Sequence, residues 1–172
     1  MPAESVTWGA QRQRNITWHD PAPSTAAGLA QPGLDYLTAM LNGELPPPPI
    51  NGLTNMELVE VVPGRAVFTC EPGEWGYNPI GTVHGGIVCT LLDTVCGCAL
   101  HSVLPAGRGF TSVEIKVNYL RPVHASSGML TATGTLVKAG SRMGFTEGVV
   151  TDSQGKVVAT ATSTLLISDL PQ

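Results

Sequence analysis

One segment of the chain, residues 85–104, carries the pattern of a long amphipathic helix. Its apolar residues recur at i, i+3 or i+4 and i+7, which is the spacing of a single helix face. Pro105 and Gly107 then end the pattern. Because strand-like segments surround this one long helix, the sequence predicts an α+β arrangement. The apolar positions are Ile87, Val88, Leu91, Leu92, Val95, Ala99, Leu100 and Val103.

The clearest strand pattern is the apolar–polar alternation at residues 110–120. The predicted apolar face consists of Val113, Ile115, Val117 and Tyr119, and the polar face of Ser112, Glu114, Lys116 and Asn118. Further strands are predicted at residues 128–138, 143–151 and 156–167, and a hairpin at residues 56–62 and 65–71. The last strand carries little charge, so we expect it to be an edge that pairs with another subunit.

At 172 residues the chain is long enough for one domain with a buried core. Residues 1–33 are polar, rich in small residues and aperiodic, and we expect a flexible arm there, disordered or loosely docked. Residues 34–172 should form a single domain. It begins with a short helix at residues 34–42, which Gly43 and the prolines at residues 46–49 bring to an end.

The bulk composition limits location and partners. No run approaches the roughly 20 apolar residues of a membrane span, and the N-terminus lacks the apolar core of a secretory signal. We therefore expect a cytoplasmic protein that does not bind membranes. The four cysteines have no CxxC spacing and no histidine at ligand spacing, so we expect buried thiols, no metal and no cofactor. The net charge of −4 and the lack of a basic stripe argue against nucleic acid.

The helix begins with His84-Gly85-Gly86, and this sequence has two interpretations. Glycines at a helix start let a ligand approach the free backbone N–H groups closely. The helix dipole adds about half a positive charge there, which suits a carbonyl oxygen that gains negative charge. Alternatively, the glycines only fit a tight turn.

Asp93 is the only charged residue between Glu74 and Arg108, and it lies in the middle of the apolar helix. Gly86, Thr90, Asp93 and Gly97 share one helical stripe of small and polar residues. That stripe either faces a narrow channel, where Asp93 would do chemistry, or is a solvent-exposed face.

Helix geometry links these two candidates. Eight residues separate Gly85 from Asp93, which corresponds to about 12 Å of helix rise. The backbone donor and the carboxylate of one chain therefore cannot both contact one carbonyl group. If both are catalytic, the site combines the helix start of one subunit with Asp93 of another.

Two motifs carry a resemblance to a known family. The stretch from Asn78 to Asp93, NPIGTVHGGIVCTLLD, resembles the signature of PaaI-like (phenylacetate-degradation-type) hotdog-fold acyl-CoA thioesterases. FTSVEIKVNYLRP, from Phe110 to Pro122, resembles the strand after the central helix in that family. The resemblance covers roughly residues 34–167 in element order. It implies one long helix wrapped by a five- to six-stranded antiparallel sheet, in a homodimer or a dimer of dimers.

The resemblance also assigns roles. It implies hydrolysis of an acyl-CoA to free acid and CoA, with Asp93 as nucleophile or general base. Asn78 and His84 would shape the site, the Gly85 N–H would polarise the carbonyl with Gly86 beside it, and a strand hydroxyl would help place water. That hydroxyl matches Ser112 best, although Thr111 is one residue away. A thiolate leaving group, with a pKa of about 8.5, departs with little acid assistance, so no catalytic triad is required.

CoA carries phosphates, so basic residues should line its entrance. By resemblance these are Arg121, Lys138 and Arg142, although solvated surface charge explains each equally well. Two other functions stay open. A non-catalytic acyl-CoA-binding hotdog protein would keep the helix-start donors without needing Asp93. A hotdog hydratase or dehydratase would recruit His84 and Asp93 as acid and base, although the spacing is closer to that of the thioesterases. The acyl group is not identified by the sequence.

Overall fold

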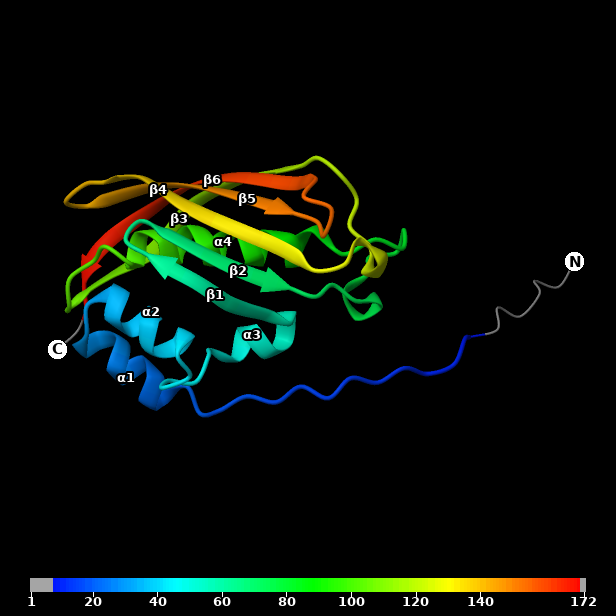
Figure 1. Ribbon diagram of the computed structural model, residues 1–172, viewed down its shortest axis with the longest axis horizontal. Coiled ribbons are helices and arrows are strands. Elements are labelled where there is room, and N and C mark those ends of the chain that lie inside the picture. The colour runs from blue at the N-terminus through cyan, green and yellow to red at the C-terminus, as the bar shows by residue number, and fades with distance from the viewer. Residues whose placement is uncertain (1–7, 171–172) are drawn as a thin grey trace, which may run out of the picture.

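The computed structural model describes residues 8–170, and in it a six-stranded antiparallel sheet wraps around one long helix (Figure 1). The strand order in the sheet is β1-β2-β4-β5-β6-β3. This confirms the predicted α+β arrangement and the predicted strand number. The elements are α1 (Ala22–Ala30), α2 (Gly33–Leu41), α3 (Pro49–Thr54), β1 (Met56–Val62), β2 (Arg65–Cys70), η1 (Glu74–Gly76), α4 (Gly85–His101), β3 (Arg108–Tyr119), η2 (Ala125–Ser127), β4 (Leu130–Ala139), β5 (Met143–Thr151) and β6 (Val157–Asp169).

The core lies between α4 and the inner face of the sheet. Leu92, Val95 and Leu100 of the helix are fully buried, as the periodicity predicts, and α4 ends at His101 rather than at residue 104. The helix lies so close to the sheet that a Cβ atom on Gly134 of β4 would be 2.0 Å from the backbone oxygen of Val95. Glycine at that strand position therefore fixes how deeply α4 packs.

The predicted alternation in β3 is wrong at its centre. The pairing of β3 with β6 shifts between Ser112 and Glu114, so Val113 is an extra residue in a β-bulge and is 60% exposed. A bulge reverses the facing of every residue on one side of it. As a result Ser112 lies on the same face as Ile115, toward α4, instead of on the outer face with Glu114.

The predicted edge strand is also wrong. β6 is an interior strand that pairs with β5 on one side and β3 on the other. The two outer strands of the sheet are β1 and β3. Helices α2 and α3 contact β1, whereas the outer edge of β3 has no strand beside it among residues 8–170.

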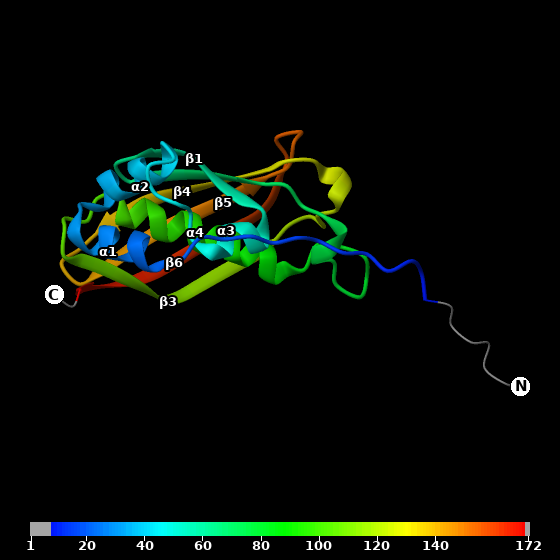
Figure 2. The same cartoon turned by 90° about the horizontal axis from the view of Figure 1, so that it is seen from below.

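The chain before the sheet is more ordered than its composition predicts. The predicted helix at residues 34–42 is confirmed by α2, but α1 and α3 were not predicted. Pro49 is the first residue of α3, where its missing N–H costs nothing, so the proline run starts a helix as well as ending one. From below, α1, α2 and α3 lie in front of α4 (Figure 2). Flexibility of the 1–33 arm stays a prediction, and residues 1–7 lie outside the described part.

Candidate active site

Asp93 is half-buried on the face of α4 that turns away from the sheet core. The hydroxyl of Ser112 donates a hydrogen bond of 2.7 Å to Oδ1 of Asp93. Thr111, the alternative hydroxyl, precedes Ser112 in β3 and therefore points to the opposite face. The bulge at Val113 is what turns Ser112 toward the helix while the rest of β3 keeps its apolar residues inward.

The start of α4 is held by several hydrogen bonds. His84 is the N-cap, and its Nδ1 accepts a 2.9 Å hydrogen bond from the Gly86 N–H, which requires an unprotonated Nδ1. The hydroxyl of Tyr119 donates to the carbonyl oxygen of Gly85 at 2.9 Å. The Gly85 N–H itself has no acceptor among residues 8–170. One backbone donor thus remains available at the positive end of the helix.

Asn78 organises the loop that leads to this helix start. Its Oδ1 accepts hydrogen bonds from the backbone N–H groups of Ile80 (3.0 Å) and Thr82 (3.2 Å). Its Nδ2 donates to the Thr82 hydroxyl at 2.8 Å. Both ends of the amide are therefore engaged inside the loop, and one N–H of Nδ2 is left over beside the helix start.

The two candidate centres open into different cavities. A small pocket of about 290 Å³, the helix-start pocket, is lined by residues that include Asn78, Gly85, Tyr119 and Arg121. A larger cavity of about 1250 Å³ is here named the chamber. It lies between residues 93–98 of α4, strands β1 and β2, and residues 19–55, which are called the N-terminal segment below. No residue lines both cavities. The separation that helix rise predicts is therefore present in the folded chain.

The cysteines are poor candidates for a nucleophile. Burial, with a smaller contribution from Asp93, raises the pKa of the Cys98 thiol to about 12. Burial raises the pKa of Cys70 and that of Cys96 to about 11. Since the thiolate is the reactive form, these three groups are unreactive near neutral pH. All four cysteines are free thiols. In the described part of the chain no cluster of three metal-binding side chains occurs.

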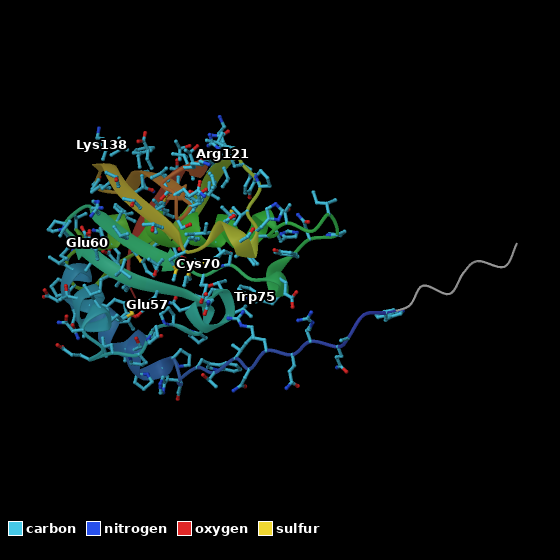
Figure 3. All side chains as sticks on the ribbon, turned by 45° about the vertical axis from the view of Figure 1, so that its right-hand side comes forward. Glu57, Glu60, Cys70, Trp75, Arg121 and Lys138 are labelled. Carbon is cyan, nitrogen blue, oxygen red and sulfur yellow. The ribbon has the colours of Figure 1, made fainter. Side chains whose placement is uncertain are left out.

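The three basic residues expected at a CoA entrance are not brought together. Arg121 follows β3 at the end of the sheet near the helix start, where its guanidinium donates to the carbonyl oxygen of Val157. Lys138 lies near the end of β4, where it pairs with Phe145 of β5, and Arg142 lies in the turn between these two strands. Through the pairings of β6 and β5, Tyr119 of β3 lies in register with Ala132 of β4. Lys138 is therefore about 20 Å further along β4 than this position. Figure 3 shows Arg121 and Lys138 well apart on the upper surface.

Two residues near the site were not recognised from the sequence. Tyr119 was assigned only to an apolar strand face, although its hydroxyl holds the start of α4. His101 has no assigned role in the sequence pattern, yet its ring packs between Tyr36 and Phe110, with ring centroids 5.7 Å from each. The contacts of Tyr119 with Gly85 and of His101 with Tyr36 join residues far apart in the sequence, so local patterns carry no signal for them.

Comparison with known proteins places the chain in a family. Residues 80–159 match the model of the Thioesterase superfamily. Human acyl-coenzyme A thioesterase 13 is 30% identical over 108 residues, which cover 62% of this chain and 76% of the human protein. The chain belongs to the thioesterase superfamily. The matched segments span 46% to 76% of the length of the first curated relatives.

Solved structures agree with this assignment. The phenylacetic acid degradation-related protein of Ralstonia eutropha superimposes on the present chain with a TM-score of 0.70 at 28% identity. The match covers 76% of the present chain and 98% of the Ralstonia protein. A Streptococcus mutans protein solved with acetyl CoA bound has a TM-score of 0.62 at 26% identity. The match covers 69% of the present chain and 92% of the Streptococcus protein. The predicted hotdog fold and PaaI-like resemblance are confirmed. No helix within residues 8–170 has the length and apolar character needed to span a membrane.

Proposed function

We propose that this thioesterase hydrolyses acyl-CoA thioesters at sites that each combine two subunits. One subunit supplies Asp93 and Ser112, and the other supplies the Gly85 N–H at the start of α4. The observation that carries the proposal is the 2.7 Å hydrogen bond from Ser112 to Asp93 on a helix face that opens into the chamber. The acyl-CoA class is supported by the human relative's name and by the acetyl CoA bound to the Streptococcus mutans neighbour.

The chemistry needs two contributions from the protein. In the general-base form, the free carboxylate oxygen of Asp93 removes a proton from a water molecule, whose oxygen attacks the thioester carbon. The Gly85 N–H and the helix dipole stabilise the resulting oxyanion. When the C–S bond breaks, the sulfur leaves as the CoA thiolate and takes up the proton. In the alternative form the Asp93 carboxylate attacks the thioester carbon and the C–S bond breaks, so that CoA leaves as its thiolate. Water then hydrolyses the mixed anhydride to the free acid and the Asp93 carboxylate.

Ser112, His84 and Asn78 act indirectly in this scheme. The Ser112 hydrogen bond fixes the orientation of the Asp93 carboxylate and leaves its second oxygen for water. His84 and Asn78 hold the helix start and its loop, which keeps the Gly85 N–H in a constant position. A donor that is already oriented contributes more to transition-state stabilisation than one that must be ordered during the reaction.

The outer edge of β3 supports the dimer. β3 has 12 residues, and an unpaired edge of that length is a ready template for a second strand. Val113, Tyr119 and Leu120 are each more than half exposed along it. Antiparallel pairing of two β3 strands about a two-fold axis would continue the sheet and bring each Asp93 toward the partner's helix start. We propose a homodimer or a dimer of such dimers, located in the cytoplasm, where free thiols are kept reduced.

Replacing the carboxylate tests this proposal. Asp93→Asn keeps the size of the side chain and removes the base, so kcat for acyl-CoA should fall by about 10²–10⁴-fold. Glu71→Gln is the matched control, since Glu71 is another carboxylate that lines the chamber but lies outside the catalytic scheme. CoA release is followed with a thiol reagent. A variant at Asp93 that retains wild-type kcat would refute the proposed role, and a wild-type chain that binds acyl-CoA without turnover would favour a binding protein.

A further inference from the structure

The chamber has two kinds of wall. On one side are residues of α4, including Asp93 and Gly97 one helical turn apart, and the ring of Phe110 packed against Gly97. On the other side are Leu41 and Leu45 from the N-terminal segment. Most of this second wall precedes residue 80, where the match to the family model begins. The chamber is therefore lined on this side by a part of the chain that the family model does not describe.

The charges of the chamber are of one sign. Among the described residues its carboxylates are Asp20, Glu44, Glu57, Glu71 and Asp93, and none of the lysines or arginines there lines it. The phosphates of CoA would be repelled by this set of charges, so the CoA moiety cannot occupy the chamber favourably. An uncharged group attached to the thioester carbon meets no such repulsion and finds the apolar side chains of β1, β2 and the N-terminal segment.

The chain that leads to the lining residues His19 and Asp20 is held by one arginine. The guanidinium of Arg14 donates to the carbonyl oxygens of Leu53 (3.0 Å) and Gly52 (2.8 Å) in α3. The same group lies 4.0 Å from the ring centroid of Trp75, which Figure 3 labels beside this part of the chain. A few residues further on, His19 and Asp20 line the chamber. Arg14 thus anchors the segment that closes it.

We propose that the chamber binds the acyl group of the substrate and that its occupant is an uncharged, extended aliphatic acyl chain. The inference rests on the proposed function, because the chamber is assigned to the acyl side by the presence of Asp93 in its wall. Its volume of about 1250 Å³ exceeds the range of roughly 300–1000 Å³ that is usual for small-molecule sites. Acyl chains that end in a carboxylate are rejected by the surrounding carboxylates. Arg14 determines specificity by holding the outer wall in place.

The first experiment compares two eight-carbon thioesters, octanoyl-CoA and the monothioester of the eight-carbon dicarboxylic acid, on the wild-type protein. We expect kcat/KM to favour octanoyl-CoA by at least about tenfold. Glu57 lies on β1 beside the N-terminal helices (Figure 3) and is exposed, so Glu57→Lys should fold normally. Glu57→Lys should raise the relative kcat/KM of the carboxylated substrate by about threefold or more.

The second experiment changes the size and closure of the chamber. Leu45→Trp places a larger side chain in the cavity, and its ratio of kcat/KM for dodecanoyl-CoA to that for acetyl-CoA should fall at least about tenfold. Arg14→Ala should lower the same ratio by about threefold or more, because the outer wall loses its anchor. Arg12→Ala is the matched control. Arg12 is an exposed arginine two residues away whose one ion pair within residues 8–170 is with Glu74, and its loss should leave the ratio at the wild-type value.

The two sets of results separate this inference from the proposed function. If acyl-CoA turnover depends on Asp93 but the acyl preferences are the same in wild type, Glu57→Lys, Leu45→Trp and Arg14→Ala, the chamber does not hold the acyl group. If no acyl-CoA is hydrolysed at all, the proposed function fails first. A preference for the carboxylated substrate in the wild-type protein would overturn the charge argument directly.

Discussion

The first turn of α4 and the middle of the same helix both interrupt an apolar pattern, but the protein holds them differently. At the first turn, His84, Tyr119 and the Asn78 loop engage almost every polar group and leave the Gly85 N–H free. In the middle, Asp93 has a single described protein partner, Ser112, and borders a large cavity. In the proposed function the first region serves as a rigid donor, and the second as a base that keeps one oxygen available. A site that needs both would join them across two chains.

Among the variants that test this comparison, the largest effect is expected from removing the rigid donor. Gly85→Pro deletes the N–H at the first helical position, where proline is well tolerated, and His84 already has the extended ψ of 133° that a residue before proline prefers. Loss of one oxyanion donor should reduce kcat by about 10²–10³-fold.

Gly85→Ala provides the control for that variant. Alanine retains the N–H but adds the same Cβ, which would lie 3.1 Å from the ring of Tyr119. Its kcat should remain well above that of the proline variant. Equal losses in the two variants would attribute the effect to crowding of Tyr119, and the distinction between donor and base would then lose its support.

A smaller effect is expected at the middle of the helix. Ser112→Ala removes the hydrogen bond to Asp93 without removing the carboxylate, so kcat should fall by about tenfold, which corresponds to about 1.4 kcal/mol. Thr111→Ala, on the outer face of β3, is the control and should leave kcat at its wild-type value.

The far end of α4 extends the comparison to a residue held by packing alone. Burial lowers the pKa of His101, whose ring lies between Tyr36 and Phe110. The unfolded chain, with a histidine pKa of about 6.5, therefore binds more protons than the folded chain as the pH falls through this value. The free energy of unfolding should accordingly decrease from pH 7.5 to pH 5.5.

His101→Phe keeps an aromatic ring in this position and removes the titrating group. Urea unfolding at the two pH values should show a smaller difference for this variant than for the wild-type protein. An unchanged pH dependence would mean that groups other than His101 account for all of it. This is the smallest of the expected effects, since it changes stability only and leaves the chemistry of the site in place.

The sequence predicts the regular elements well because their patterns are local. The 3.6-residue periodicity of α4 and the alternation in the strands are each contained within a short window, and all six strands were located. The bulge at Val113 was not predicted, because it exists only in the pairing of β3 with β6, about 50 residues away. The interior position of β6 depends on the same long-range pairing.

The candidate site was predictable in its composition but not in its arrangement. A lone carboxylate in an apolar helix indicated Asp93, and the glycines indicated the helix start. The choice of Ser112 over Thr111 depended on the bulge, and the contact of Tyr119 with Gly85 joins residues 34 apart. Helices α1 and α3 have weak or short patterns, so the chamber that they help to close had no signal in the sequence.

The central claim is that each active site combines Asp93 of one subunit with the helix start of another, and mixed dimers test it most directly. Asp93→Asn and Gly85→Pro subunits, carrying different tags, are unfolded together, refolded and purified, and acyl-CoA hydrolysis is measured. Each variant alone should be nearly inactive. In a random mixture half of the dimers are heterodimers, each with one intact site, so about a quarter of wild-type activity should return. If the mixture stays as inactive as its two components, the site lies within one chain and the account is contradicted.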